Sequence, residues 1–419
     1  PEATIDVVDI EPELENLSKR FFNLADDATI KTHTMDARRF LQNPPYQYDL
    51  VFSDIYSSLY SLPVHASTRE FFRDLKTALA PDGMVVINVI GSLSRTEPSL
   101  TFSLMRTMRE EFLNTAFFAV RSRAVTEPQN IIFVGINGTR VLDAGDYEAG
   151  RIDPERYDLS RYPLFTDVYA PVESATRNLF EQIEQGNGFS GKEALALITQ
   201  QLSFGPRHVG SEGHTRMRDF LRRELSVFAD EVIIQRFEYE GQTLANVLAR
   251  FNPESADRVI LGTHYDTNPT PPIPGANNGA SGVGVLLELA RVIANEQSTR
   301  GVDLVFFDAE EGLRGVQAAD WRPIGSEYFA AHLVDLYPTK KPQSALVVDM
   351  VCEKNADIRD RSTDIHDDHT ALNSVGIPST LLIDFEYPYN YTIKDTPDKC
   401  SAGSLQSVGD TLVAYLRSL

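Results

Sequence analysis

Five short motifs in the second half of the chain carry the residue types that a hydrolytic metal site needs. They are Thr263-His264-Tyr265-Asp266, 275–282 (GANNGASG), 306–312 (FFDAEEG), Asp367-Asp368-His369 and 391–399 (YTIKDTPDK). Several of these motifs place an acid or a histidine directly after an apolar run. In open α/β sheets the active site forms outside the carboxyl ends of the strands. We therefore expect these side chains to meet at one edge of a sheet.

The acids at these strand ends suit two different tasks. Zinc hydrolysis needs about three protein ligands of His, Asp or Glu type and an open position. It also needs a free carboxylate that can move protons. Glu310 and Glu311 follow the run at 304–307, and neighbouring side chains can leave a strand end in different directions. Asp349 ends another run, and Tyr391 follows a third across a short loop.

Each of these residues also has a purely structural interpretation. Glu310 and Glu311 could hydrogen-bond loop amides, and His264 could be a structural histidine as readily as a functional one. Asp367 and Asp368 could cap the helical stretch that starts at the next residue. Turn geometry or packing could equally explain a last group: Asp395, Asp398 and Trp321.

The second half of the chain has the pattern of an α/β domain that could position these motifs. Helical spacing and β-like runs alternate along it. The predicted helices are 192–202, 213–228, 283–295 and 404–416, and the predicted strands are 231–237, 258–262, 302–308, 345–350 and 379–383.

The first half alternates strand and helix, which implies a parallel, doubly wound sheet. The predicted strands are 5–9, 28–34, 49–54, 84–90, 117–121 and 130–135, and the helices include 12–24, 68–80 and 99–112. Residues 138–185 lose this rhythm and are interpreted as the end of the first domain plus a linker. We therefore predict two α/β domains, 1–175 and 186–419.

Composition excludes several classes of function. The chain has 419 residues, enough for two or three domains, and its net charge of −21 argues against sequence-independent binding to nucleic acid. Cys352 and Cys400 offer no disulfide framework and fit a reducing compartment. No apolar run approaches the roughly 20 residues of a membrane span.

The motifs of the second half, together with Phe204-Gly205-Pro206-Arg207, resemble the zinc-dependent aminopeptidase family that includes the glutaminyl-peptide cyclotransferases. The resemblance implies a zinc-exopeptidase-type α/β/α sandwich with a mixed sheet and a peptide substrate. It implies a general acid/base at Glu310 and catalytic acids at Asp349 and Asp367. In cyclotransferases the metal polarises the side-chain amide of an N-terminal glutamine, and the α-amine attacks it to release ammonia.

The same resemblance implies three zinc ligands, at Glu311, Asn278 and Tyr391, but the family has aspartate and histidine at the last two positions. Asparagine offers only a neutral carbonyl oxygen, and tyrosine must lose a proton of pKa about 10 to bind a metal well. Two hypotheses follow. The domain either acts on peptide N-termini with a metal, or it is a degenerate pseudoenzyme that binds a peptide or a protein partner.

The motifs 8–12 (VDIEP), 36–41 (DARRFL), 48–54 (YDLVFSD) and 67–72 (STREFF) resemble spermidine synthase-like aminopropyltransferases of the S-adenosylmethionine-dependent fold. The resemblance implies nucleoside binding by Asp9 and Asp36, and a reaction centre at Asp54. The first strand and its glycine-rich loop are missing from this match, so aminopropyl transfer is kept as an alternative function. Polyamine chemistry favours the cytoplasm, whereas related peptide-processing enzymes are often exported, so the compartment stays open.

Overall fold

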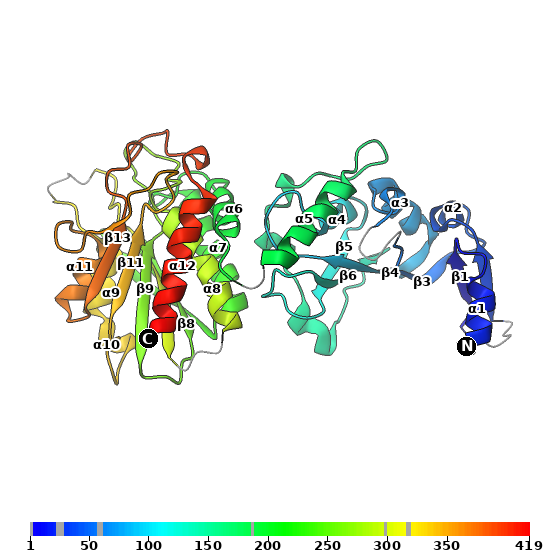
Figure 1. The fold of residues 1–419 in the computed structure, drawn as a ribbon, viewed down its shortest axis with the longest axis horizontal. Helices are drawn as coiled ribbons and strands as arrows, with labels where there is room; N and C mark the ends of the chain where they lie inside the picture. Colours follow the sequence, from blue (N-terminus) through cyan, green and yellow to red (C-terminus); the bar gives the residue numbers. More distant parts are fainter. Residues whose placement is uncertain (1–2, 22–28, 57–61, 186–187, 297–299, 316–319) are drawn as a thin grey trace.

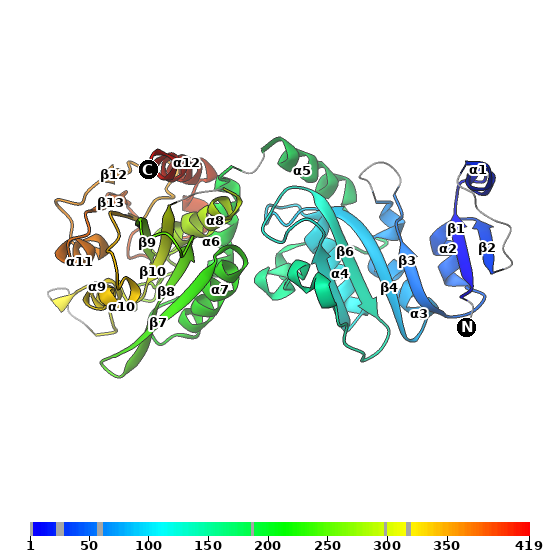
Figure 2. The same cartoon turned by 90° about the horizontal axis from the view of Figure 1, so that it is seen from below.

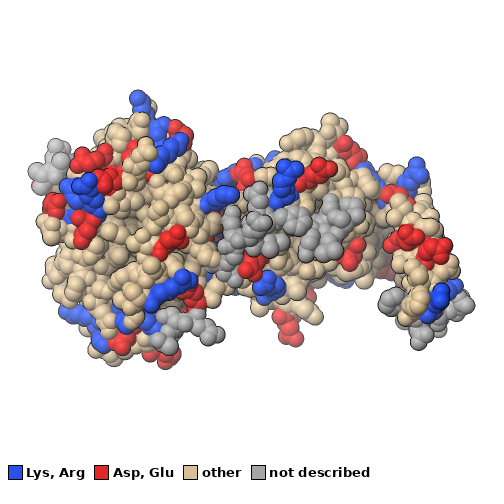
Figure 3. Space-filling view, viewed as in Figure 1, with Lys and Arg blue, Asp and Glu red and all other residues tan. Residues whose placement is uncertain are grey.

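The chain forms two α/β units that lie end to end (Figure 1). The computed structural model describes residues 3–21, 29–56, 62–185, 188–296, 300–315 and 320–419. Acidic and basic side chains are interspersed over the face shown in Figure 3. None of the described helices is both long and apolar enough to cross a membrane.

The main sheet of the first unit has four strands in the order β3-β4-β6-β5. They are β3 (Tyr48–Ser53), β4 (Leu79–Gly91), β5 (Asn114–Ala119) and β6 (Gln129–Ile136). β3 and β4 are parallel, but β6 is antiparallel to both of its neighbours. The prediction of an all-parallel sheet is therefore wrong here. Residues 120–128, which join β5 to β6, contain no helix, and a parallel connection needs a crossover of a dozen or more residues.

A separate parallel pair, β1 (Ile5–Asp9) and β2 (Ile30–Thr34), stands beside this sheet (Figure 2). Among the described residues a side-chain contact joins the pair to β3: the Tyr48 hydroxyl donates to Asp6 Oδ2 over 3.0 Å. No strand of the described residues lies between β1 and β3. On the open edge of β3, Leu50 and Phe52 are 55% and 66% exposed.

The helices of the first unit include the predicted ones, and two further α-helices, α2 (Ala37–Gln42) and α5 (Val172–Gln185), were not predicted. The predicted ones are α1 (Leu14–Phe21), α3 (Arg69–Ala78) and α4 (Leu100–Glu111). Residues 22–24 of the predicted first helix lie outside the described residues. Tyr162 and Phe165, from the segment interpreted as a domain end and linker, pack in the same core as Phe71 and Phe102. That part of the segment is therefore an integral part of the first unit.

The second unit is built on a seven-stranded mixed sheet in the order β12-β13-β11-β9-β10-β8-β7. The strands are β7 (Glu231–Tyr239), β8 (Gln242–Phe251), β9 (Arg258–His264), β10 (Gly301–Phe307), β11 (Ala345–Asp349), β12 (Arg359–Asp360) and β13 (Ser379–Ile383). The four central strands are parallel, and β7, β8 and β12 are antiparallel to their neighbours. The expected mixed sheet is confirmed. β8 was not predicted, although Gly241, with a φ of 75°, marks its hairpin turn with β7.

Helices cover both faces of this sheet. One apolar core contains alternate β10 residues together with α6 (Gly191–Leu202), α7 (Glu212–Phe228), α8 (Ser281–Asn295) and α12 (Ala402–Ser418). The other core lies under α9 (Ile324–Ala331), α10 (Leu333–Leu336) and α11 (Asp368–Ser374). Successive β10 side chains point to opposite faces of the sheet and so belong to different cores. Leu304 and Phe306 enter the first core, whereas Val305 and Phe307 enter the second. This is the predicted α/β/α sandwich.

Candidate functional site

The ends of three adjacent parallel strands bring His264, Asp349 and Glu310 together. His264 ends β9, Asp349 ends β11, and Glu310 follows β10. His264 Nε2 lies 3.2 Å from Asp349 Oδ1, and His264 Nδ1 lies 3.9 Å from Glu310 Oε2. Burial alone would lower the pKa of His264, but the carboxylates of Asp349 and Glu310 outweigh it and raise that pKa. The two acids therefore favour the protonated form of the imidazole.

A tight turn after β10 aims Glu310 and Glu311 into the site. Asp266 holds the turn, because its two carboxylate oxygens accept the backbone amides of Glu310 (3.0 Å) and Glu311 (3.1 Å). Ala309 in the turn has a φ of 55°, and two other non-glycine residues with positive φ, Met350 and Tyr391, also flank the site. Residues other than glycine adopt this conformation at a cost, so the fold constrains these strand ends closely.

Asp367 and Asp368 add two more buried carboxylates. Asp367 is the N-cap residue of α11, and it accepts the backbone amide of Asp368 over 2.6 Å. The capping interpretation therefore holds for Asp367 without excluding a catalytic role. Burial and the neighbouring acids raise the pKa of Asp367 and of Glu310 well above the usual range, and burial raises that of Asp368 to about 7.

The glycine-rich turn 275–282 places Asn278 against Glu311. Asn278 Nδ2 donates to Glu311 Oε1 over 2.5 Å and to Asn390 Oδ1 over 2.9 Å. Gly279 has a φ of 88°, and a Cβ there would lie 2.3 Å from the carbonyl oxygen of Asp266, so only glycine fits. Asn278, which was predicted to bind zinc through its oxygen, therefore directs its amide nitrogen at the Glu311 carboxylate instead.

Tyr391, the third predicted ligand, lies at the rim of the site. Its side chain is 53% exposed, and its backbone amide donates to Asn390 Oδ1 over 2.9 Å. Burial of the hydroxyl and the carboxylates of Glu311 and Glu310 raise the pKa of Tyr391 above its usual value. The phenol is therefore protonated at neutral pH in the metal-free protein.

Another donor set within the site fits a divalent cation. Among the described residues, ligand atoms of His264, Glu310 and Glu311 all lie within 4.8 Å of one another, and all three residues are buried. Two carboxylates and an imidazole are suitable zinc ligands. Asn278 Oδ1 is buried and lacks a hydrogen-bond partner in the described part of the chain. A rotation of this amide would turn its oxygen toward Glu311, where it can serve as a further ligand. The residues present therefore fit a metal held by His264 and Glu311.

The buried carboxylates predict a pH-dependent stability for the metal-free protein. Burial raises the pKa of Glu311 from 4.5 to about 7. Between these values the native state keeps a proton that the unfolded state has released, so the free energy of unfolding falls as pH rises, by up to about 1.4 kcal/mol per pH unit for this group. We expect Glu311→Gln to have a shallower slope in urea titrations between pH 4.5 and 7. The exposed Glu212→Gln serves as a control, and parallel slopes for all three proteins would contradict the burial of an ionisable Glu311.

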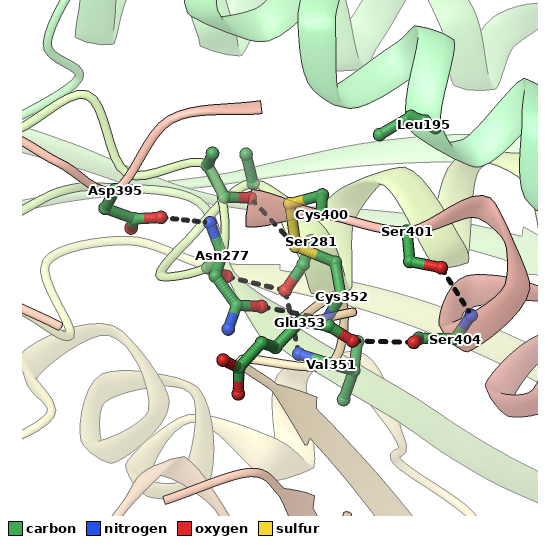
Figure 4. Close-up of a disulfide and its surroundings, with 12 residues drawn as sticks. Leu195, Asn277, Ser281, Val351, Cys352, Glu353, Asp395, Cys400, Ser401 and Ser404 are labelled. Carbon is green, nitrogen blue, oxygen red and sulfur yellow. Dashed lines mark hydrogen bonds between the residues drawn. A yellow bond between two sulfur atoms is a disulfide. The ribbon is translucent and has the colours of Figure 1, made fainter. Parts of the chain in front are cut away.

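A disulfide braces the loops below the glycine-rich turn (Figure 4). The two cysteines, from which no disulfide framework was expected, are joined as Cys352–Cys400. The backbone amide of Cys352 donates to Asn277 Oδ1 over 2.9 Å, and that of Ser401 donates to the carbonyl of Cys352 over 2.7 Å. Because the loop between the cysteines carries Asp367 and Tyr391, the bridge closes a covalent ring around part of the site.

Several residues that shape the site were not predicted as functional. Asp395 accepts the backbone amides of Asn277 (2.8 Å) and Asn278 (3.1 Å). It therefore holds the glycine-rich turn as well as the turn that contains Asp395. The buried Arg207 donates to the carbonyls of Pro274 and Gly275 from the other side. Arg207 lies between two glycines in the sequence, but neither its segment nor that of Asp395 indicates which backbone groups are bound.

The three acids predicted for the nucleoside site and its reaction centre lie at strand ends of the first unit, each with a different partner. Asp9 accepts the amide of Glu11 (2.8 Å), and Asp36 caps α2 and lies 3.0 Å from His65 Nε2. Asp54 accepts from Asn88 Nδ2 (2.9 Å). Asp9 and Asp54 are exposed. In the described residues these acids therefore lie at separate strand ends, and aminopropyl transfer stays a prediction.

Comparisons with known proteins agree with this geometry for the second unit. Residues 246–359 match the model of peptidase family M28. The chain is 29% identical to glutaminyl-peptide cyclotransferase of Drosophila melanogaster over 140 residues, which is 30% of this chain and 38% of that protein. It is 33% identical to a probable zinc metalloprotease of Pyrenophora tritici-repentis over 155 residues, which is 30% of this chain and 32% of that protein. The solved structure of Porphyromonas gingivalis glutaminyl cyclase matches 55% of this chain and 98% of its own, with a TM-score of 0.50 and 27% identity.

The first unit has a different relative. The chain is 23% identical to polyamine aminopropyltransferase of Vibrio vulnificus over 192 residues. This match covers 45% of this chain and 62% of that protein. The chain thus spans less than two thirds of the length of each of these curated relatives. The C-terminal part of the chain contains a peptidase M28 domain with glutaminyl cyclase-like structural neighbours, and its N-terminal part is homologous to polyamine aminopropyltransferase.

Proposed function

We propose that the second domain (186–419) binds the amino terminus of a peptide in the carboxylate site and acts on it with a divalent metal. The reaction is cyclisation of an N-terminal glutamine or hydrolysis of the first peptide bond. The observation that carries the proposal is the convergence of Glu310, Asp349 and His264, all buried, beside Glu311. The M28 match and the glutaminyl cyclase-like neighbours support the same class of reaction.

Each residue has a distinct proposed role. Glu311 and His264 hold the metal, with Asn278 Oδ1 and Tyr391 at the remaining positions. A bound zinc ion supplies Lewis-acid polarisation of the substrate carbonyl. Glu310 takes a proton from the attacking amine or water, a task suited by its raised pKa. Glu310 then gives this proton to the leaving group, while Asp349 and Asp367 accept hydrogen bonds that orient the reacting groups.

A second candidate function rests on one specific contact. Asn278 Nδ2 donates to Glu311 Oε1, so a neutral amide already satisfies the carboxylate that should bind the metal. Such a contact stabilises the site without any cation. In this case the domain is a pseudoenzyme, and the pocket binds a peptide or a protein partner without turnover.

Zinc analysis of the native protein distinguishes the two functions. After metal supplementation and dialysis, we expect about one zinc per chain and turnover of glutaminyl or aminoacyl peptides. Glu310→Gln should keep the fold and lose about 10²–10⁴-fold in rate, the usual contribution of a general base. The exposed Glu212→Gln should keep full activity. Absence of both zinc and turnover, with peptide binding retained, would establish the pseudoenzyme instead.

A further inference from the structure

The two domains are joined by a buried ionic contact. Arg95, in the loop after β4, donates through Nη2 to Glu224 Oε2 of α7 over 2.6 Å. Arg156 donates through Nη2 to the same oxygen over 2.9 Å. Both arginines belong to the first domain, whereas Glu224 belongs to the second. Gln200 Nε2 also donates to the backbone carbonyl of Arg156 over 2.7 Å.

This contact is sealed from solvent. Arg95, Arg156 and Glu224 are 7%, 3% and 1% exposed. A second acid, Glu193, accepts the backbone amide of Arg95 over 2.9 Å and is 4% exposed. Opposite charges are therefore matched across the contact. Removing one partner of such a pair is strongly destabilising.

The same helix reaches the functional site with its first turns. His214 of α7 lies with Nε2 at 2.6 Å from Asp308 Oδ1, and both side chains are fully buried. Asp308 Oδ2 accepts the backbone amide of Ala245 over 2.7 Å. Asp308 stands two residues before Glu310, in the turn that aims the catalytic carboxylates. α7 thus connects the interdomain contact to that turn.

We propose that the first domain supports the carboxylate site of the second: Arg95 and Arg156 fix α7 through Glu224, and α7 fixes the Glu310–Glu311 turn through His214 and Asp308. Glu224 and His214 are positioning residues in this arrangement. The proposal deepens the proposed function, because it identifies what orients the same acids. It gives the first domain a task that needs no nucleoside cofactor.

The test uses the full-length, metal-free chain and does not depend on activity. In Glu224→Met, hydrogen exchange of the 308–312 amides should accelerate at least about tenfold, because two buried arginines lose their partner and α7 loosens. Trp321, the only tryptophan, donates to the Glu310 carbonyl over 2.8 Å, so its emission should shift as well. Glu212→Met, at an exposed position of the same helix, is the matched control and should leave both signals unchanged.

A rescue variant separates positioning from a general loss of stability. In Arg95→Met/Arg156→Met/Glu193→Gln/Glu224→Met the four buried charges are removed together, and the amide oxygen of the glutamine can still accept the backbone amide at position 95, which restores a packed contact. We expect this variant to recover native exchange at 308–312 and native Trp321 emission. If Glu224→Met does not fold, Glu224→Gln, which keeps the side-chain shape, takes its place. Faster exchange confined to the interdomain contact, with 308–312 unchanged, would overturn the proposal, while zinc content and turnover test the proposed function separately.

Discussion

The variant Asn278→Asp/Tyr391→His should bind zinc more than about 100-fold more tightly than the native chain, since loss of an outer-shell partner alone typically costs 10- to 100-fold in metal affinity. Asn278 now donates its amide hydrogen to Glu311, and an aspartate there replaces this donor with an anionic ligand. Tyr391 has its pKa raised by burial and by the nearby carboxylates, whereas a histidine offers a neutral ring nitrogen at pH 7.

Competition with a zinc chelator measures the affinity, and elemental analysis gives the stoichiometry. Asn268→Asp is the matched control, because Asn268 also donates to Glu311 (Oε2, 3.1 Å) but does not stand at a predicted ligand position. Asn268→Asp adds the same negative charge as Asn278→Asp, but its zinc affinity should rise far less than that of the double variant. If the double variant binds no more zinc than this control, Asn278 and Tyr391 do not line the metal position.

Loss of the disulfide should have the largest effect on stability. The cysteines are 48 residues apart. Closing a loop of that length lowers the entropy of the unfolded chain enough to stabilise the fold by about 4 kcal/mol. We expect Cys352→Ser/Cys400→Ser to lower the free energy of unfolding by about that amount in urea titrations at constant pH.

A reductant provides the control for this prediction. It should lower the urea midpoint of the native chain toward that of the double serine variant and leave the variant itself unchanged. An equal midpoint for native and variant chains under oxidising conditions would show that the two thiols are not bridged in solution.

The strand ends that form the site were predictable, because the sequence places the polar residues after apolar runs and the sheet topology brings the ends of those runs together. His264 and Asp349 each end a fully buried strand and Glu310 follows another, and adjacent parallel strands bring their carboxyl ends together. The α/β/α sandwich follows from the same alternation of apolar runs and helices. These features depend on local patterns, which a single sequence displays.

Contacts between distant residues were not predictable in this way. Arg95 and Glu224 are 129 residues apart, and nothing near either residue identifies its partner. The orientation of the Asn278 amide depends on Glu311 and Asn390, which belong to other loops. The strand β6 was predicted, but its antiparallel direction was not, because the preceding alternation of strand and helix suggested another parallel strand. Each miss concerns pairing between segments, which is a property of the whole fold.

The last long helix of the chain has a consequence for synthesis. Gln406 of α12 accepts the backbone amide of Gly191 over 2.8 Å and donates to the carbonyl of Phe189 over 2.9 Å, 217 residues earlier. At 5–20 residues per second the ribosome needs roughly 10–40 s to make that stretch. During this interval the first domain can already fold and α8 can already pack on α6, whereas the part of α6 that α12 covers stays exposed. A nascent chain stalled before residue 402 should therefore be the form that chaperones hold longest.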